Sequence, residues 1–318
     1  MKRREFLISL SAAIGTNLLA THNRGYAETM ADVRARTYRV LGVPLRAGSL
    51  LPGNENDAQA YREVQLLARL QAVGCKAVDD GDVTIPSYLP HHSIPPIRSW
   101  PAPRIAWECV RDRVAPLLLQ PSQIPLLIGC DCSVVIGTTE ALMRALAQDI
   151  HVLYVDGDFD DAAPESGRCQ SAASCAVWLL THNSPFWTGP PLRPSQVSVF
   201  GWTNPSRSAQ LGTGSISLAE VRRTGPQEAA RQAMQAFPAS ASLLLHFDID
   251  VLQKRDMPAA YFPHSEGMSL SEAAEVLGVF LKDPRIRLIE ISEYASLRDI
   301  GRIYVNKLAN LLTEGLKR

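Results

Sequence analysis

The chain has 318 residues, which is long enough to bury a large core as one α/β domain or as two domains. Its 32 lysines and arginines balance its 32 aspartates and glutamates, so the formal net charge is zero. Because no overall field attracts polyanions, neither nucleic acid nor an anionic membrane surface is an expected partner. The long apolar stretch lies at the extreme N-terminus, and we expect no internal membrane span.

The N-terminus has the features of a targeting segment. Lys2, Arg3 and Arg4 form a basic start, a weakly apolar run follows at 8–20, and small residues near 25–27 suit a cleavage site. The segment resembles a twin-arginine export signal. We therefore predict a signal peptide at 1–27, a mature domain at 28–318 and a periplasmic or secreted location, with no membrane attachment after cleavage. A short basic helix at a cytosolic N-terminus is the alternative.

The mature chain alternates between two hydrophobic patterns. Short apolar runs typical of buried strands occur at 38–43, 124–128, 152–155, 197–200, 243–247 and 286–289. Helical spacing occurs between them at 59–73, 134–147, 172–180, 218–236, 270–281 and 303–316. This alternation predicts a single α/β domain with a central, mainly parallel sheet covered on both faces. The proline-rich stretch 86–103 predicts a surface loop, which either borders the site or is a variable connection.

Carboxylates follow three of the predicted strands directly. These residues are Asp131; Asp156, Asp158, Asp160 and Asp161; and Asp248 and Asp250. Because ligands bind beyond the carboxyl ends of parallel strands, these side chains should converge. Gathered carboxylates repel one another unless a cation neutralises them, so the combination predicts a divalent metal site. Taken alone, each cluster also fits a helix cap or a turn.

The order and spacing of these clusters resemble the arginase, agmatinase and formimidoylglutamase family. The segments that carry the resemblance are 40–44, 78–82, 129–133, 156–160, 246–250 and 288–291. It implies a three-layer α-β-α fold, a small-molecule substrate, assembly as a trimer or hexamer, and two manganese ions that activate water for attack on a guanidinium or amidine carbon. By position, one ion is held by Cys132, Asp156, Asp160 and Asp248, and the other by Asp156, Asp158, Asp248 and Asp250.

The chain departs from the family pattern at several of these positions. Cys132 and Asp158 replace the two metal-binding histidines, and the family's substrate-side histidine has no counterpart in 161–175. The additional negative charge holds cations firmly but weakens their ability to acidify bound water. A thiolate prefers zinc or iron, whereas aspartates suit manganese. A single metal held by Asp156, Asp158 and Asp250 is one alternative, and a neutral, packed Cys132 thiol is another.

Three residues are candidates for catalytic roles: Asp158, His246 and Glu290. His246 precedes Asp248 by two residues on the same side of its strand, which suits either support of a metal ligand or a hydrogen-bonded core position. Glu290 ends an apolar strand and is expected to contact substrate. His264, in a loop that by resemblance passes the site, is either a general acid or base or a solvent-facing histidine.

The six cysteines show no disulfide framework: Cys75, Cys109, Cys130, Cys132, Cys169 and Cys175. The leading functional prediction is a metal-dependent hydrolase of a non-peptide C–N bond in an amidine, guanidine or amide. The alternative is a protein of the same fold that has lost catalysis and binds a ligand or metal without turnover. A cysteine nucleophile at Cys132 comes third, because no histidine lies near it in sequence.

Overall fold

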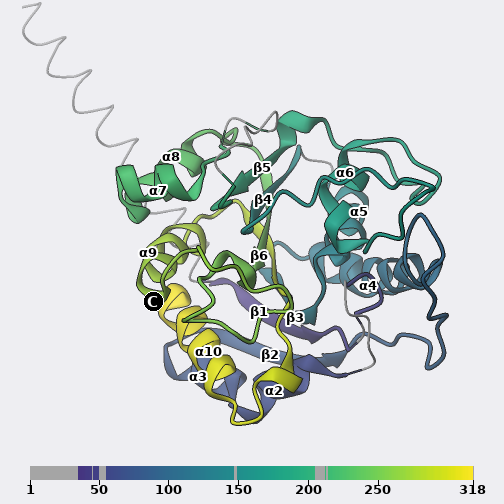
Figure 1. Ribbon diagram of the computed structural model, residues 1–318. Helices are drawn as coiled ribbons and strands as arrows, with labels where there is room; N and C mark the ends of the chain where they lie inside the picture. Colours follow the sequence, from purple (N-terminus) through teal and green to yellow (C-terminus); the bar gives the residue numbers. More distant parts are fainter. Residues whose placement is uncertain are drawn as a thin grey trace, which may run out of the picture.

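A computed structural model describes residues 35–44, 46–49, 55–146, 149–204, 212 and 214–317. The predicted export signal at 1–27 lies outside these residues. A central sheet runs through the molecule with helices on both of its faces (Figure 1). This is the three-layer α-β-α architecture that the alternating pattern predicted. Among the described residues, no helix has the length and apolar character that a membrane crossing requires.

The sheet has seven strands, all paired in parallel, in the order β2-β1-β3-β7-β6-β4-β5. Their bounds are β1 Thr37–Gly42, β2 Lys76–Asp82, β3 Gln123–Cys130, β4 Ile150–Val155, β5 Val197–Phe200, β6 Ser242–Asp248 and β7 Ile286–Ser292. The consecutive strands β3 and β4 are separated in space by β7 and β6. Loops beyond this central part of the sheet therefore enclose a crevice, where ligands bind in open α/β folds.

Each face of the sheet carries its own hydrophobic core. In β3, Leu126 and Ile128 pack on one side and Leu127 on the other, as the two-residue period of a strand requires. The first core is covered by α2 Asp57–Glu63, α3 Leu66–Ala72, α7 Leu218–Thr224, α8 Pro226–Gln235, α9 Leu270–Phe280 and α10 Ile303–Leu316. The second is covered by α4 Ala102–Leu118, α5 Val135–Ala145 and α6 Ala176–Thr181.

Two of the predicted helices are each divided in the structure. The helix expected over 59–73 is broken at Gln65, which has a left-handed φ of 59°, so that α2 and α3 are separate. The helix expected over 218–236 is broken at Gly225 and Pro226. Glycine adopts the positive φ of 95° without strain, and proline then starts the next helix because its missing N–H is not needed there.

Two elements were not predicted as such. The edge strand β2 ends in three aspartates and a glycine, a composition that sequence patterns assign to turns. The long helix α4 follows the proline-rich loop and contains Pro116 itself, which obscures its helical period. The predicted loop before α4 is present, and its Ile97 forms a bridge with Gln170, a residue that lines the pocket described below.

Candidate metal centre

The candidate site lies at the carboxyl ends of the four central strands. Cys132 follows β3, Glu293 follows β7, Asp156 follows β4, and Asp248 ends β6. Because these strands are parallel and adjacent, residues far apart in sequence meet at one edge of the sheet. Ligand atoms of Asp156, Asp248 and Asp250 all lie within 4.8 Å of one another. The structure thus brings together carboxylates from two of the three predicted clusters.

Local turns fix the orientation of these carboxylates. Asp156 Oδ1 accepts the backbone N–H of Asp158 at 2.6 Å, and Asp248 Oδ1 accepts that of Asp250 at 2.7 Å. Aspartate commonly closes such a turn with the residue two positions later. Asp250 Oδ1 in turn accepts the N–H of Gly157 at 3.1 Å. Asp156 Oδ2 is buried and has no hydrogen-bond partner among the described residues, so one strong acceptor is left for a ligand.

Negative charge accumulates at this site. Burial, followed by the charge of neighbouring aspartates, raises the pKa of Asp156 and Asp248 well above the usual aspartate range. Burial raises the pKa of Asp160 too, against the hydrogen bond that it accepts from Tyr154. Within the described residues, no salt bridge joins any of these three carboxyls to a lysine or arginine. A divalent cation would supply the missing positive charge.

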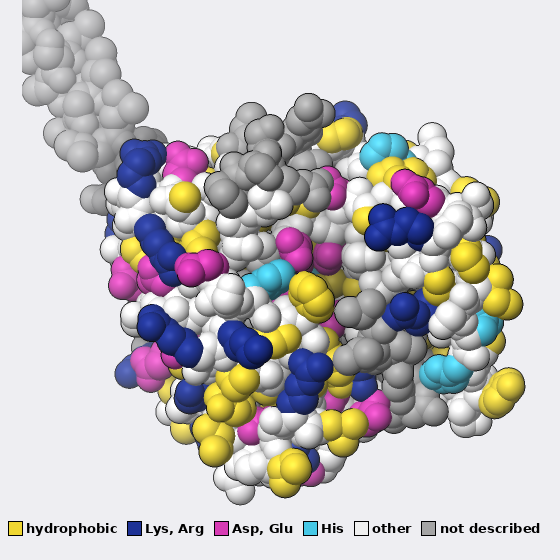
Figure 2. Space-filling model, viewed as in Figure 1, with side chains coloured by type: hydrophobic (Ala, Val, Ile, Leu, Met, Phe, Trp, Pro, Cys, Tyr) yellow, Lys and Arg dark blue, Asp and Glu magenta, His cyan; other side chains and the backbone are white. Residues whose placement is uncertain are grey.

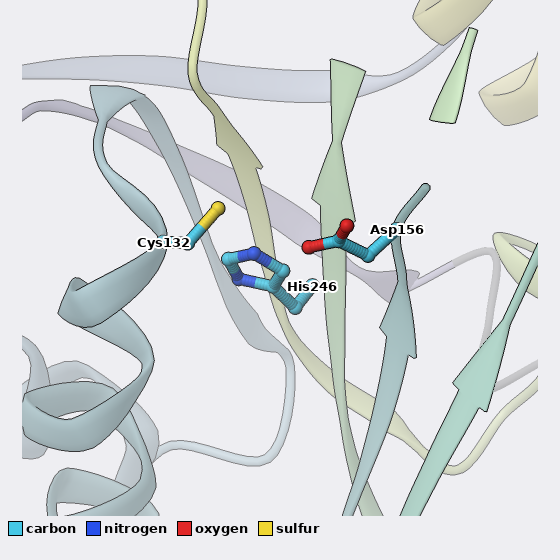
Figure 3. A group of neighbouring side chains, drawn as sticks. All are labelled: Cys132, Asp156 and His246. Atoms are coloured by element: carbon cyan, nitrogen blue, oxygen red, sulfur yellow. The ribbon is translucent and has the colours of Figure 1, made fainter. Parts of the chain in front are cut away.

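The donor set fits such a cation. Asp156, Asp248 and Asp250 offer clustered oxygen ligands, and no donor in the described part of the chain bonds to Asp156 Oδ2. Carboxylate oxygens are the ligands that manganese and magnesium prefer. A second group within the same distance limit contains Cys132, Asp156 and His246, whose side chains face one another (Figure 3).

Two side chains of this second group, those of Cys132 and His246, already have protein partners. The Cys132 thiol donates to Asp248 Oδ2 at 2.7 Å, and its sulfur lies 3.3 Å from Ser292 Oγ. His246 Nε2 lies 3.1 Å from Ser292 Oγ, and His246 Nδ1 lies 2.8 Å from Glu290 Oε2. Burial raises the pKa of Cys132 well above its usual range, with the charge of Asp248 as the second cause. This series of hydrogen bonds therefore holds the Cys132 thiol against Asp248, one of the carboxylates of the site.

His246 and Glu290 are held within the sheet. Both side chains are fully buried, and His246 pairs with Tyr154 on one side and Glu290 on the other. The Tyr154 ring stacks on the imidazole with centroids 4.3 Å apart, and its hydroxyl donates to Asp160 Oδ2 at 2.6 Å. Neither His246 nor Glu290 is among the residues that line the pocket, so substrate contact by Glu290 stays a prediction.

A pocket of about 360 Å³ opens above these residues. Its lining includes the Cys132 thiol and five carboxylates. The carboxylates are those of Asp158, Asp160, Asp248, Asp250 and Glu293. On the face shown in Figure 2, acidic side chains and a histidine gather near the middle of the molecule. The volume is at the lower end of the range for small-molecule sites.

Glu293 is a site residue that was not predicted from the sequence. Strand alternation places Glu290 and Ser292 on one side, and the positive φ of 61° at Glu293 then changes the direction of the chain. Its Oε1 accepts the N–H of Cys132 at 3.2 Å. Burial, followed by the charge of Asp131, raises the pKa of Glu293 well above its usual range. The Ser292-Glu293 pair directly after an apolar strand was the available signal.

The remaining candidates lie at different depths. Asp158 is at the open side, with a side chain that is 49% exposed, and lies 3.4 Å from Nε2 of His264. The Asp250 carboxylate, 3.3 Å from the same nitrogen, raises the pKa of His264. All six cysteines are free, so Cys130 and Cys132 form no bridge.

Comparisons with known proteins agree with this architecture. The sequence model of the arginase family matches residues 36–316. An N(omega)-hydroxy-L-arginine amidinohydrolase from Streptomyces lavendulae is 31% identical over 188 residues, which cover 56% of this chain and 63% of that protein. An arginase from Agrobacterium fabrum is 23% identical over 81% of this chain and 84% of its own length. The crystal structure of Bacillus subtilis arginase superposes with a TM-score of 0.76 at 18% identity, over 89% of this chain and 99% of that one. The chain belongs to the arginase family.

Proposed function

We propose that this protein is a metal-dependent hydrolase that cleaves a non-peptide C–N bond in a small amidine, guanidine or amide. The observation that carries the proposal is the buried group of Asp156, Asp248 and Asp250, which has an unpartnered carboxylate oxygen and adjoins a pocket of about 360 Å³. The relatives named above are an amidinohydrolase and arginases, which supports hydrolysis as the family-level reaction.

Asp156, Asp248 and Asp250 would hold a divalent cation, and Asp158 and Asp160, which line the adjoining pocket, are the candidates for further oxygen ligands. Manganese suits this oxygen-rich set, in which the Cys132 thiol donates a hydrogen bond to Asp248. Once bound, the metal would supply Lewis acidity, activating water and polarising the carbon under attack. The protein's own groups must bind the substrate and move protons.

The pocket chemistry favours a cationic head group. Five carboxylates and one guanidinium, that of Arg168, line the pocket. An amidinium or guanidinium group can donate to pocket carboxylates that the metal leaves free. Arg168 is exposed, so it can pair with an anionic group at the outer end of a substrate. Tyr261 and Phe262 add an apolar wall.

Glu293 is our candidate for the proton donor to the leaving nitrogen. It lines the pocket, and its raised pKa keeps a proton on the carboxyl at higher pH than an exposed glutamate would. The backbone N–H of Cys132 fixes its orientation. His246 acts indirectly, because it is hydrogen-bonded to Ser292, and the Ser292 hydroxyl is in turn hydrogen-bonded to the thiol of Cys132.

A turnover screen tests this function. The protein would be loaded with manganese and assayed for release of ammonia, urea or amine from a panel of guanidines, amidines and amides, with Asp156→Asn as the matched inactive variant. Turnover by the wild type that is lost in Asp156→Asn supports the proposal. Ligand binding without turnover across the panel contradicts it and establishes the binding-only alternative.

A further inference from the structure

His264 reaches the metal centre from a part of the chain outside the three acidic clusters. It lies in the loop between η4 (Ile249–Val251) and α9, and its carbonyl accepts the backbone N–H of Lys254 at 2.8 Å, which fixes the loop against the end of η4. Its ring packs edge-on against Phe262 with centroids 5.4 Å apart. The side chain is only 15% exposed. The imidazole is therefore held in place at the site.

The position of the His264 Nε2 atom suits a metal ligand that binds the same cation as a neighbouring carboxylate. Among the described residues, no hydrogen bond of good geometry reaches the buried Nε2, which lies 3.3 Å from Asp250 Oδ2 and 3.4 Å from Asp158 Oδ2. Charge-assisted hydrogen bonds are usually about 2.7–2.9 Å long. Two ligand atoms that each lie about 2.0–2.2 Å from one cation are roughly 3.0–3.5 Å apart. The two distances therefore match co-ligands better than hydrogen bonds.

Gly157 leaves space for the imidazole ring of His264. A Cβ at position 157 would lie 2.7 Å from Cδ2 of His264 and 3.1 Å from Asp250 Oδ1. Alanine at 157 would collide with the His264 ring, so the missing side chain at Gly157 allows the imidazole to lie beside Asp250.

We propose that His264 is a metal ligand, which binds a divalent cation together with Asp250. This inference rests on the proposed metal centre and adds a ligand to it. The imidazole binds through Nε2, which lies 3.3 Å from Asp250 Oδ2, at the cation position nearer to solvent. Asp156 and Asp248 belong to the deeper position.

Cation binding by the full-length mature protein tests the inference without reference to activity. Titration calorimetry with Mn²⁺ gives the number of ions and their affinities, and the visible spectrum of the Co²⁺ form reports nitrogen ligation. The variants are His264→Ala and the polar His264→Gln, with His182→Ala, an exposed histidine at the end of α6, as the matched control. Thermal unfolding verifies that each variant is folded.

We expect wild type and His182→Ala to bind two ions with the same spectrum. His264→Ala and His264→Gln should retain one ion at unchanged affinity, bind the second at least about tenfold more weakly, and lose a nitrogen-dependent Co²⁺ band. Asp158→His combined with His264→Ala should regain the second ion. If both His264 variants bind two ions as wild type does, the inference is wrong although the metal centre stands; if wild type binds no ion, the proposed function fails instead.

Discussion

Two groups of aspartates lie at strand ends in this protein, and their environments differ. At the end of β2, Arg62 pairs with Asp79 and Asp82, and Arg39 pairs with Asp80. The hydrogen bond from Arg62 lowers the pKa of Asp79. In the metal centre, by contrast, burial raises the pKa values of the carboxyls, and no described lysine or arginine forms a salt bridge with Asp156, Asp160 or Asp248.

The comparison shows that acidic residues at a strand end do not by themselves make a metal site. Each aspartate of the β2 group is paired with an arginine from β1 or α2, so the group has counter-charge of its own, and its ion pairs are partly exposed. The central group, Asp156, Asp160 and Asp248, lies at the carboxyl ends of four strands and, among the described residues, forms no salt bridge with an arginine. A cation is needed where the protein buries carboxylates without supplying its own counter-charge.

The largest effect should come from substituting one aspartate in each group. Asp156→Asn should lower manganese affinity by more than about 100-fold, since it removes a central ligand, and should abolish turnover. Asp79→Asn should leave manganese content unchanged and lower the free energy of unfolding by at most about 1 kcal/mol, because its ion pair is partly exposed. Metal analysis and urea unfolding check both. Equal loss of metal in the two variants would contradict the distinction.

A second prediction separates metal binding from proton transfer within the centre. Glu293→Gln should keep its manganese but lower kcat by about 100-fold, because glutamine preserves the shape of the side chain and cannot donate an acidic proton. Steady-state kinetics and metal analysis of one preparation measure both quantities. A kcat within threefold of wild type would show that another group protonates the leaving nitrogen.

A third prediction concerns the stability of the metal-free protein. Asp156, Asp160 and Asp248 have raised pKa values, so the folded protein binds protons more tightly than the unfolded chain does. The stability that this provides is present at low pH and is lost as pH rises above the ordinary aspartate value of 3.8. The Tm of the chelated protein should therefore fall by at least about 3 °C between pH 5 and pH 8.

Manganese should raise the Tm most at pH 8, where the carboxylates are charged, and so flatten this pH dependence. Differential scanning calorimetry of the same sample with and without chelator gives the comparison. A Tm that rises toward pH 8 without metal would mean that the carboxylates are neutralised inside the protein, as those of β2 are.

The smallest effect is expected at Cys132. Its thiol donates to Asp248, and a serine hydroxyl can donate to the same oxygen, so Cys132→Ser should retain manganese within about twofold of wild type. Metal analysis after growth with mixed metals checks this result. Loss of bound metal, or a change from zinc or iron in wild type to manganese in the variant, would identify Cys132 as a thiolate ligand.

The predictable part of the fold follows from burial on both sheet faces. The central strands are continuous apolar runs, so their positions and the site at their ends could be read from the sequence. The edge strand β2 could not, because its residues are charged and its pairing with β1 is set by tertiary contacts. The break at Gly225 and Pro226 does have a sequence signal, because glycine commonly ends one helix and proline starts the next.

Within the site, residues on regular strands were predicted more readily than those placed by unusual backbone geometry. Asp156 and Asp248 lie at strand ends, where alternation sets their direction. Glu293 faces the pocket only because its φ is positive, a conformation that glutamate rarely adopts and no pattern predicts. The placement of His264 beside Asp250 depends on loop packing and on the missing Cβ at Gly157.

The central claim is that uncompensated carboxylates hold divalent cations, and the metal content of the purified protein tests it most directly. The protein would be purified without chelators after expression in manganese-supplemented cells, and its metals would be counted by mass spectrometry. The account predicts about two manganese ions per chain in wild type and clear loss in Asp156→Asn. A wild-type protein that contains no divalent metal, and takes up none on dialysis against manganese, would contradict it.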